Sequence, residues 1–87
     1  MNLYDEELML WLERHFDETE LTLDALAREF GVTLFALQGY LDNVYFAPKK
    51  GRGVAVHAEY ALVQVRIKAY RDHLENDYGV LSDPLIF

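Results

Sequence analysis

A single glycine, Gly31, separates two short stretches with helical periodicity, and this feature constrains the fold most. The apolar residues of both stretches recur at spacings of three and four: Leu23, Leu26, Ala27 and Phe30 before the glycine, and Leu34, Leu37, Tyr40 and Leu41 after it. Glycine is the residue best able to adopt the left-handed backbone that ends a helix. Thr22 and Thr33 are good helix caps. Residues 22–43 therefore predict two short helices joined by about three residues.

A further helix is predicted before this pair. Five residues fall on one helical face, which we expect to pack in the core: Tyr4, Leu8, Trp11, Leu12 and His15. Asn2 can cap this helix, and acidic residues follow where the helix dipole favours negative charge. The polar run 17–20 predicts the link to the next helix. With 87 residues, the chain fits one domain over 1–87.

The pattern changes after Asn43. Two β-prone triplets, 44–46 and 54–56, flank a loop that contains Pro48 and two glycines. Such a segment predicts a β-hairpin with a basic tip. An irregular loop is the alternative.

Residues 58–78 are compatible with two structures. A long helix would place Tyr60, Val63, Ile67, Tyr70 and Leu74 on one face, and Gly79 would end it. Residues 63–68 also alternate strictly, as a half-buried strand would. We favour the helix, because its spacing holds over four turns. The apolar end, Leu85-Ile86-Phe87, is expected to fold back onto the core or to dock on a second subunit.

The segment 22–41 resembles the helix-turn-helix of DNA-binding regulators. Ala27, a small residue, precedes Gly31 by four positions, and Leu37 and Tyr40 follow it by six and nine. With the hairpin as a wing, the wider arrangement resembles a winged helix domain. The resemblance implies a mainly α fold, with a three-helix helix-turn-helix core, a small β-hairpin wing and a long C-terminal helix. It also implies that the second helix of the pair enters the major groove of DNA while the wing touches the backbone.

In this resemblance the outward residues of the second helix are Thr33, Phe35, Gln38, Gly39 and Asp42. Only Gln38 belongs to the set of side chains that usually read base edges. Phe35 suits contact with a thymine methyl group, and Thr33 suits a phosphate or base. Asp42 repels phosphate, and Gly39 weakens the helix by roughly 1 kcal/mol relative to alanine.

Charge is distributed in three blocks. Residues 1–43 have a balance of −8, residues 44–71 a balance of +5, and residues 72–87 carry four acidic side chains and no basic one, for a total of −7. The central block includes Lys49, Lys50 and Arg52 at the expected hairpin tip, where they suit a wing that grips phosphates. Arg66, Lys68 and Arg71 could extend that grip. The alternative is that all six are solvated, with Lys68 and Arg71 paired to Asp72 and Glu75.

Other functions are disfavoured. The absence of cysteine excludes disulfides and thiol catalysis, and His15, His57 and His73 are widely spaced, without further ligands at metal-binding spacing. No phosphate loop, dinucleotide fingerprint or nucleophile motif is present. We therefore expect no enzyme, no catalytic residue, no cofactor and no metal. Apolar runs are far shorter than the roughly 20 residues of a membrane span, and the N-terminus does not resemble a signal peptide, so a soluble, cytoplasmic protein is expected, with no membrane partner.

Two hypotheses of function follow. The first is a small DNA-binding transcriptional regulator that acts as a homodimer on double-stranded DNA. Its DNA-binding residues would be Thr33, Phe35, Gln38, Lys49, Lys50 and Arg52, and its dimer interface would be Tyr60, Val63, Ile67, Tyr70 and Leu74. The second is an acidic protein-interaction module, such as an inhibitor or adaptor encoded by a mobile element. In that case Phe35 and the acidic first helix would dock on a basic protein surface or imitate nucleic acid.

Overall fold

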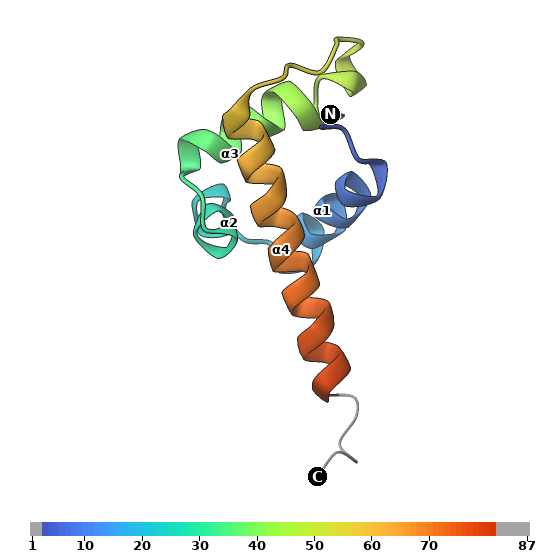
Figure 1. Cartoon of the computed structure of the whole chain (residues 1–87), viewed down its shortest axis with the longest axis vertical. Coiled ribbons are helices and arrows are strands. Elements are labelled where there is room, and N and C mark those ends of the chain that lie inside the picture. The colour runs from blue at the N-terminus through green and yellow to red at the C-terminus, as the bar shows by residue number, and fades with distance from the viewer. Residues whose placement is uncertain (1–2, 82–87) are drawn as a thin grey trace.

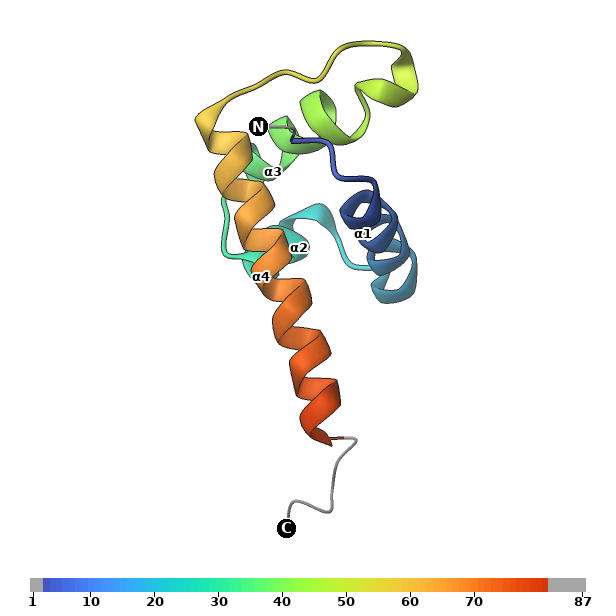
Figure 2. The ribbon, with the colours of Figure 1, turned by 45° about the vertical axis from the view of Figure 1, so that its right-hand side comes forward.

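The computed structural model describes residues 3–81, with side chains as far as residue 76. Over that range the chain forms four α-helices: α1 (Glu6–Thr19), α2 (Leu23–Phe30), α3 (Leu34–Tyr40) and α4 (Ala58–Leu81). Figures 1 and 2 show α1, α2 and α3 gathered around one half of α4, while the other half of α4 extends beyond them. Among the described helices, none combines the length and apolar composition that a bilayer span requires.

Helix α1 begins later than the sequence suggests. Its cap is Asp5, whose side chain accepts a hydrogen bond from the Leu8 backbone N–H at 3.2 Å. Asn2, the expected cap, lies outside the described residues. Leu8 and Leu12 are fully buried, and His15 is half-buried, so the predicted inner face does pack against the core.

The pair α2 and α3 confirms the two-helix prediction. Thr22 accepts from the Ala25 N–H at 3.2 Å, and Thr33 accepts from the Ala36 N–H at 3.0 Å. Gly31 ends α2 with φ of 74°, in the left-handed region. These local signals all lie within a few residues of the helix ends they control, which is why the sequence reveals them.

The expected β-hairpin, and with it the winged helix arrangement, is wrong. Residues 44–46 are not a strand: α3 continues into η1 (Leu41–Tyr45), one turn of π-helix, and a 3₁₀ turn, η2 (Pro48–Lys50), follows. The second triplet, 54–56, has no regular secondary structure, and the described residues contain no strand. One backbone hydrogen bond, from the Ala55 N–H to the Asn43 C=O at 3.1 Å, connects the second triplet to η1.

Burial explains the error. Leu41, Val44 and Tyr45 are all buried, and their spacing of three and one brings them to the same side of a helix. In a strand, neighbouring side chains would point to opposite faces, and one of Val44 and Tyr45 would leave the core. The free energy gained by burying these side chains therefore outweighs the β propensity of the triplet.

Helix α4 confirms the favoured interpretation of residues 58–78 and excludes the strand. It runs past Gly79 to Leu81, so the glycine does not end it. Val63 and Ile67 are buried against the other helices, and the buried Gln64 donates from Nε2 to the Leu3 carbonyl at 3.1 Å. The apolar end 85–87 lies outside the described residues.

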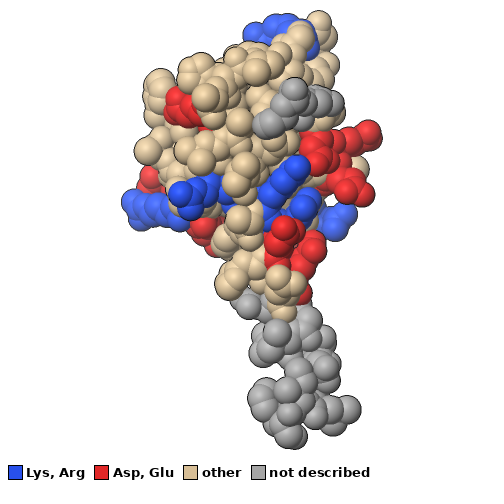
Figure 3. Space-filling model, viewed as in Figure 1, with Lys and Arg blue, Asp and Glu red and all other residues tan. Residues whose placement is uncertain are grey.

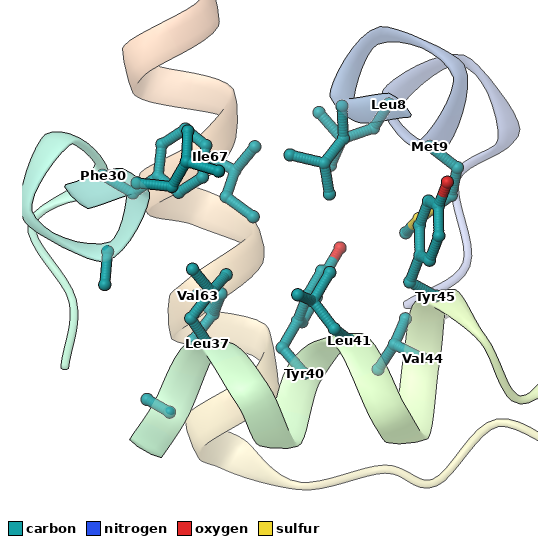
Figure 4. Close-up of a cluster of buried hydrophobic side chains, with 14 of the residues drawn as sticks. Leu8, Met9, Phe30, Leu37, Tyr40, Leu41, Val44, Tyr45, Val63 and Ile67 are labelled. Atoms are coloured by element: carbon teal, nitrogen blue, oxygen red, sulfur yellow. The ribbon is translucent and has the colours of Figure 1, made fainter. Parts of the chain in front are cut away.

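The core lies where the first three helices meet α4. Figure 4 shows side chains from all four helices and from η1 converging there, among them Leu8, Phe30, Tyr40, Val44 and Ile67. Tyr40 is 0% exposed, and its hydroxyl has no hydrogen-bond partner within the described part of the chain. Burial raises the pKa of Tyr40.

A polar and aromatic cluster joins α1, α2 and α4 beside this core. The Tyr70 hydroxyl donates to Oε2 of Glu29 at 2.6 Å, and Nε2 of His15 lies 3.5 Å from Oε1 of the same carboxylate. The His15 ring stacks on Trp11 with ring centroids 4.8 Å apart. Burial, and then the Glu29 contact, raise the pKa of Tyr70 to about 12.

Candidate functional site

The outer face of α3 carries the most exposed large apolar side chain of the described residues. Phe35 is 80% exposed, although it is a large aromatic residue. Thr33 and Gln38, which the sequence also placed on this face, are exposed as well. The three predicted residues of this helix are therefore accessible to a partner.

A hollow of about 290 Å³ lies beside Phe35, between α3 and the start of α4. Its lining comprises Phe35, Gln38, Gly39, Asp42, Asn43, Glu59 and Tyr60. Nδ2 of Asn43 donates both to the Tyr60 hydroxyl and to the Gly39 carbonyl, each at 2.9 Å, and thereby links the two helices. The lining includes two carboxylates, Asp42 and Glu59, and no lysine or arginine, so this site favours positively charged ligands.

One of the predicted tip cations is already engaged. Nζ of Lys49 lies 3.3 Å from Oε2 of Glu13 and 3.2 Å from the Tyr45 hydroxyl. It also lies 4.4 Å from the centroid of the Tyr45 ring. The hydrogen bond with Tyr45, and then the one with Glu13, raise the pKa of Lys49. The hydrogen bonds that Glu13 accepts from Tyr45 and Lys49 lower the pKa of Glu13. Lys49 thus holds the tip to α1, whereas Lys50 and Arg52 are exposed and form no ion pair with any described residue.

The tip and the start of α3 lie far apart. In Figures 1 and 2 the tip lies beyond η1, at the opposite end of the continuous helical segment from the first turn of α3. Figure 3 shows Lys and Arg in several separate places on the face that carries α4. Two cations of α4 form ion pairs of their own, Lys68 with Asp5 and Arg71 with Asp72, both at 3.3 Å. The six basic residues of the central block therefore do not converge on one face with Phe35. The two ion pairs stand in place of the pairs of Lys68 with Asp72 and of Arg71 with Glu75, which were the alternative suggested by the sequence.

The predicted dimer stripe packs largely inside its own chain. Val63 is 1% exposed and Ile67 is 0% exposed. Tyr60 and Tyr70 make the intrachain hydrogen bonds described above, and Leu74 is half-buried. A homodimer stays a prediction, but Val63 and Ile67 are not accessible to a second copy.

A second surface feature was missed by the sequence analysis. A groove of about 400 Å³ lies between α1, the start of α2 and η1, lined by Glu13, Phe16, Asp17, Leu23, Leu41, Tyr45 and Phe46. The signal was present in the spacing of Leu41 and Tyr45, which continues the helical period of α3. Reading residues 44–46 as a strand concealed it.

Within residues 3–76 no group of three His, Asp or Glu side chains is arranged to hold a metal ion. No family model, no curated protein and no solved structure matches this chain.

Proposed function

We propose that this chain is an acidic protein-binding module whose outer α3 face docks on a basic surface of another protein. The observation that carries this proposal is Phe35, 80% exposed beside the carboxylates of Asp42 and Glu59. Phenylalanine, like Tyr and Trp, is enriched at protein–protein interfaces relative to the rest of the surface. Acidic neighbours direct such a residue towards a partner that carries Lys or Arg.

The energetics favour the same partner. Burying a phenylalanine side chain contributes about 1.5–3 kcal/mol, so docking of Phe35 would supply a useful part of a binding free energy. The net charge of −7 repels DNA and accelerates association with a cationic protein. No lysine or arginine lines the hollow next to Phe35 to oppose that attraction.

Affinity capture with and without nuclease tests the proposal. We expect the tagged chain to retain a basic protein after nuclease treatment, and Phe35→Ala to lose it. Leu10→Ala is the matched control, because Leu10 is also an exposed apolar residue, at 55%, but belongs to α1. Capture that depends on nucleic acid, or that survives Phe35→Ala, contradicts the proposal.

A DNA-binding transcriptional regulator is the second candidate. It is supported by Phe35 and Gln38, which are exposed on a helix that follows a three-residue turn, and by Thr33, the exposed cap of that helix. Fluorescence anisotropy with a random-sequence DNA duplex at low salt tests it. Binding that weakens on Gln38→Ala, and that falls steeply with added salt, would favour this candidate over protein binding.

A further inference from the structure

The groove between α1, α2 and η1 has an apolar floor. Phe16 and Leu23 come from α1 and the start of α2, while Leu41, Tyr45 and Phe46 come from η1 and the residue after it. An adjoining hollow of about 340 Å³ shares Leu23, Leu41 and Phe46 with it and adds Gln38 and Asp42. The two hollows therefore adjoin across these shared residues, and together we call them the α1–η1 groove.

The π turn shapes this groove. The Phe46 N–H donates to the Leu41 carbonyl at 2.8 Å, a bond that spans five residues where an α-helix would span four. The extra residue in the turn shifts the direction of the side chains that follow. Phe46 is left 37% exposed at the groove, with its ring edge against Tyr45. Single π turns of this kind occur frequently at functional sites.

Carboxylates stand at both ends of the α1–η1 groove. Asp17 lies at the α1 end and Asp42 at the α3 end; both are exposed, and neither is paired with a cation among the described residues. Glu13 also lines the α1 end, but it is shared with Lys49. No lysine or arginine lines either hollow; Lys50, with Nζ 5.8 Å from the centroid of the Phe46 ring, is the basic side chain beside the floor. The groove thus combines an apolar floor with unneutralised negative charge at its ends.

We propose that the α1–η1 groove binds an amphipathic, basic peptide segment of a protein partner. Apolar side chains of the segment occupy the floor formed by Leu23, Leu41 and Phe46, while flanking Lys or Arg side chains face Asp17 and Asp42. This inference rests on the proposed protein-binding function and adds to it the chemistry of the partner. Gln38 and Asp42 line both the groove and the hollow beside Phe35, so the two surfaces adjoin.

Charge complementarity selects this occupant. A phosphate-bearing ligand would meet Asp17 and Asp42 with like charge. Residues 72–87 of the chain itself carry four acidic side chains and no Lys or Arg, so the C-terminal segment of a second copy would be repelled by the same carboxylates. A cationic helix with one apolar face satisfies both the floor and the ends, which is the usual chemistry of helix-in-groove recognition.

Titration with a defined peptide tests the proposal. The probe is a synthetic peptide of about 18 residues, some five turns of helix, made only of Leu and Lys at helical spacing. We expect backbone amide shifts in ¹H–¹⁵N spectra at Leu23, Leu41 and Phe46. Phe46→Ala should weaken binding by about tenfold, whereas Leu10→Ala, which also truncates an exposed apolar side chain but lies outside the groove, should leave it unchanged.

Two charge-reversal variants provide the second test of the groove proposal. Asp17→Lys should weaken peptide binding by about tenfold. Glu18→Lys makes the same change in net charge one residue away, outside the groove, and should weaken peptide binding by less than about twofold. Equal losses for these two variants, or shifts that map elsewhere, overturn the proposal and indicate only attraction to an acidic protein. Asp17 is exposed near the end of α1, so its variant keeps the fold.

The two proposals fail separately. If the peptide binds in the groove but Phe35→Ala does not reduce capture, the proposed docking of α3 is contradicted and the groove proposal stands. If Phe35→Ala abolishes capture but the peptide does not bind in the groove, the groove proposal is overturned and the proposed protein-binding function stands.

Discussion

The ring of Tyr60 packs directly against Gly39: a Cβ atom on that glycine would lie 3.1 Å from Cε1 of Tyr60. The Tyr60 hydroxyl is held in place by the Nδ2 group of Asn43 at 2.9 Å. A glycine that weakens α3 on propensity alone is therefore what allows α4 to approach it this closely.

Gly39→Ala tests that contact. The substitution would add about 1 kcal/mol of helix propensity, but it forces a ring that Asn43 anchors to move. We expect a net loss of about 1 kcal/mol in the free energy of unfolding, measured by urea denaturation. In a Tyr60→Ala background the same change should instead stabilise the protein. If Gly39→Ala stabilises both backgrounds equally, the contact does not limit the approach of α4.

Gly31 and Gly53 both have open surroundings, so alanine substitutions at these two positions distinguish backbone strain from packing. Neither Gly31 nor Gly53 has an atom within 4 Å of an added Cβ, but Gly31 has φ of 74° and Gly53 has no such positive value. Gly31→Ala should cost about 1–2 kcal/mol, because only its backbone conformation is penalised. Gly53→Ala should gain about 0.4–1 kcal/mol by restricting the unfolded chain. Thermal unfolding of the two variants should therefore shift in opposite directions.

Two tyrosines should respond oppositely to loss of the hydroxyl. Tyr40 is fully buried and its hydroxyl lacks a partner within residues 3–76, so Tyr40→Phe should raise the free energy of unfolding by about 1 kcal/mol. Tyr70 donates to Glu29 at 2.6 Å, so Tyr70→Phe should lower it by about 0.5–1 kcal/mol. Denaturant titration measures both. A loss on Tyr40→Phe would mean that its hydroxyl has a partner after all.

Asp5 should make stability depend on acid. The hydrogen bond from the Leu8 N–H, and then the contact with Lys68, lower its pKa below the ordinary 3.8. Because the folded state holds the proton less tightly, this contribution is present above the ordinary pKa and is lost as the pH falls through the folded value. Asp5→Asn, which keeps a capping side chain, should reduce the stability difference between about pH 7 and about pH 3.

Asp5→Ala provides the comparison. It removes the cap as well as the charge, and should cost about 1 kcal/mol at neutral pH. An Asp5→Asn protein that loses as much stability on acidification as the unchanged protein would place the acid sensitivity elsewhere, for instance at Glu13, whose pKa is also lowered.

Much of the fold could be predicted from local sequence signals. Thr22, Thr33 and Gly31 act on backbone atoms within a few residues, and the periodicity of α4 extends over several turns. The exposure of Phe35 was also foreseen, because its place on α3 follows from the positions of the buried residues on the same helix.

The segment 41–57 and the α1–η1 groove could not be predicted in this way. Val44, Tyr45 and Phe46 prefer strands when considered alone, but α1 and α4 provide a core that buries Val44 and Tyr45 only if the helix continues. By itself the sequence determined where α2 and α3 begin, where α2 ends and which face of α3 is outside, since those depend on neighbouring residues. Only the tertiary structure decided that η1 replaces a hairpin, that Lys49 is paired with Glu13 and that Val63 and Ile67 are buried, because each depends on residues distant in the chain.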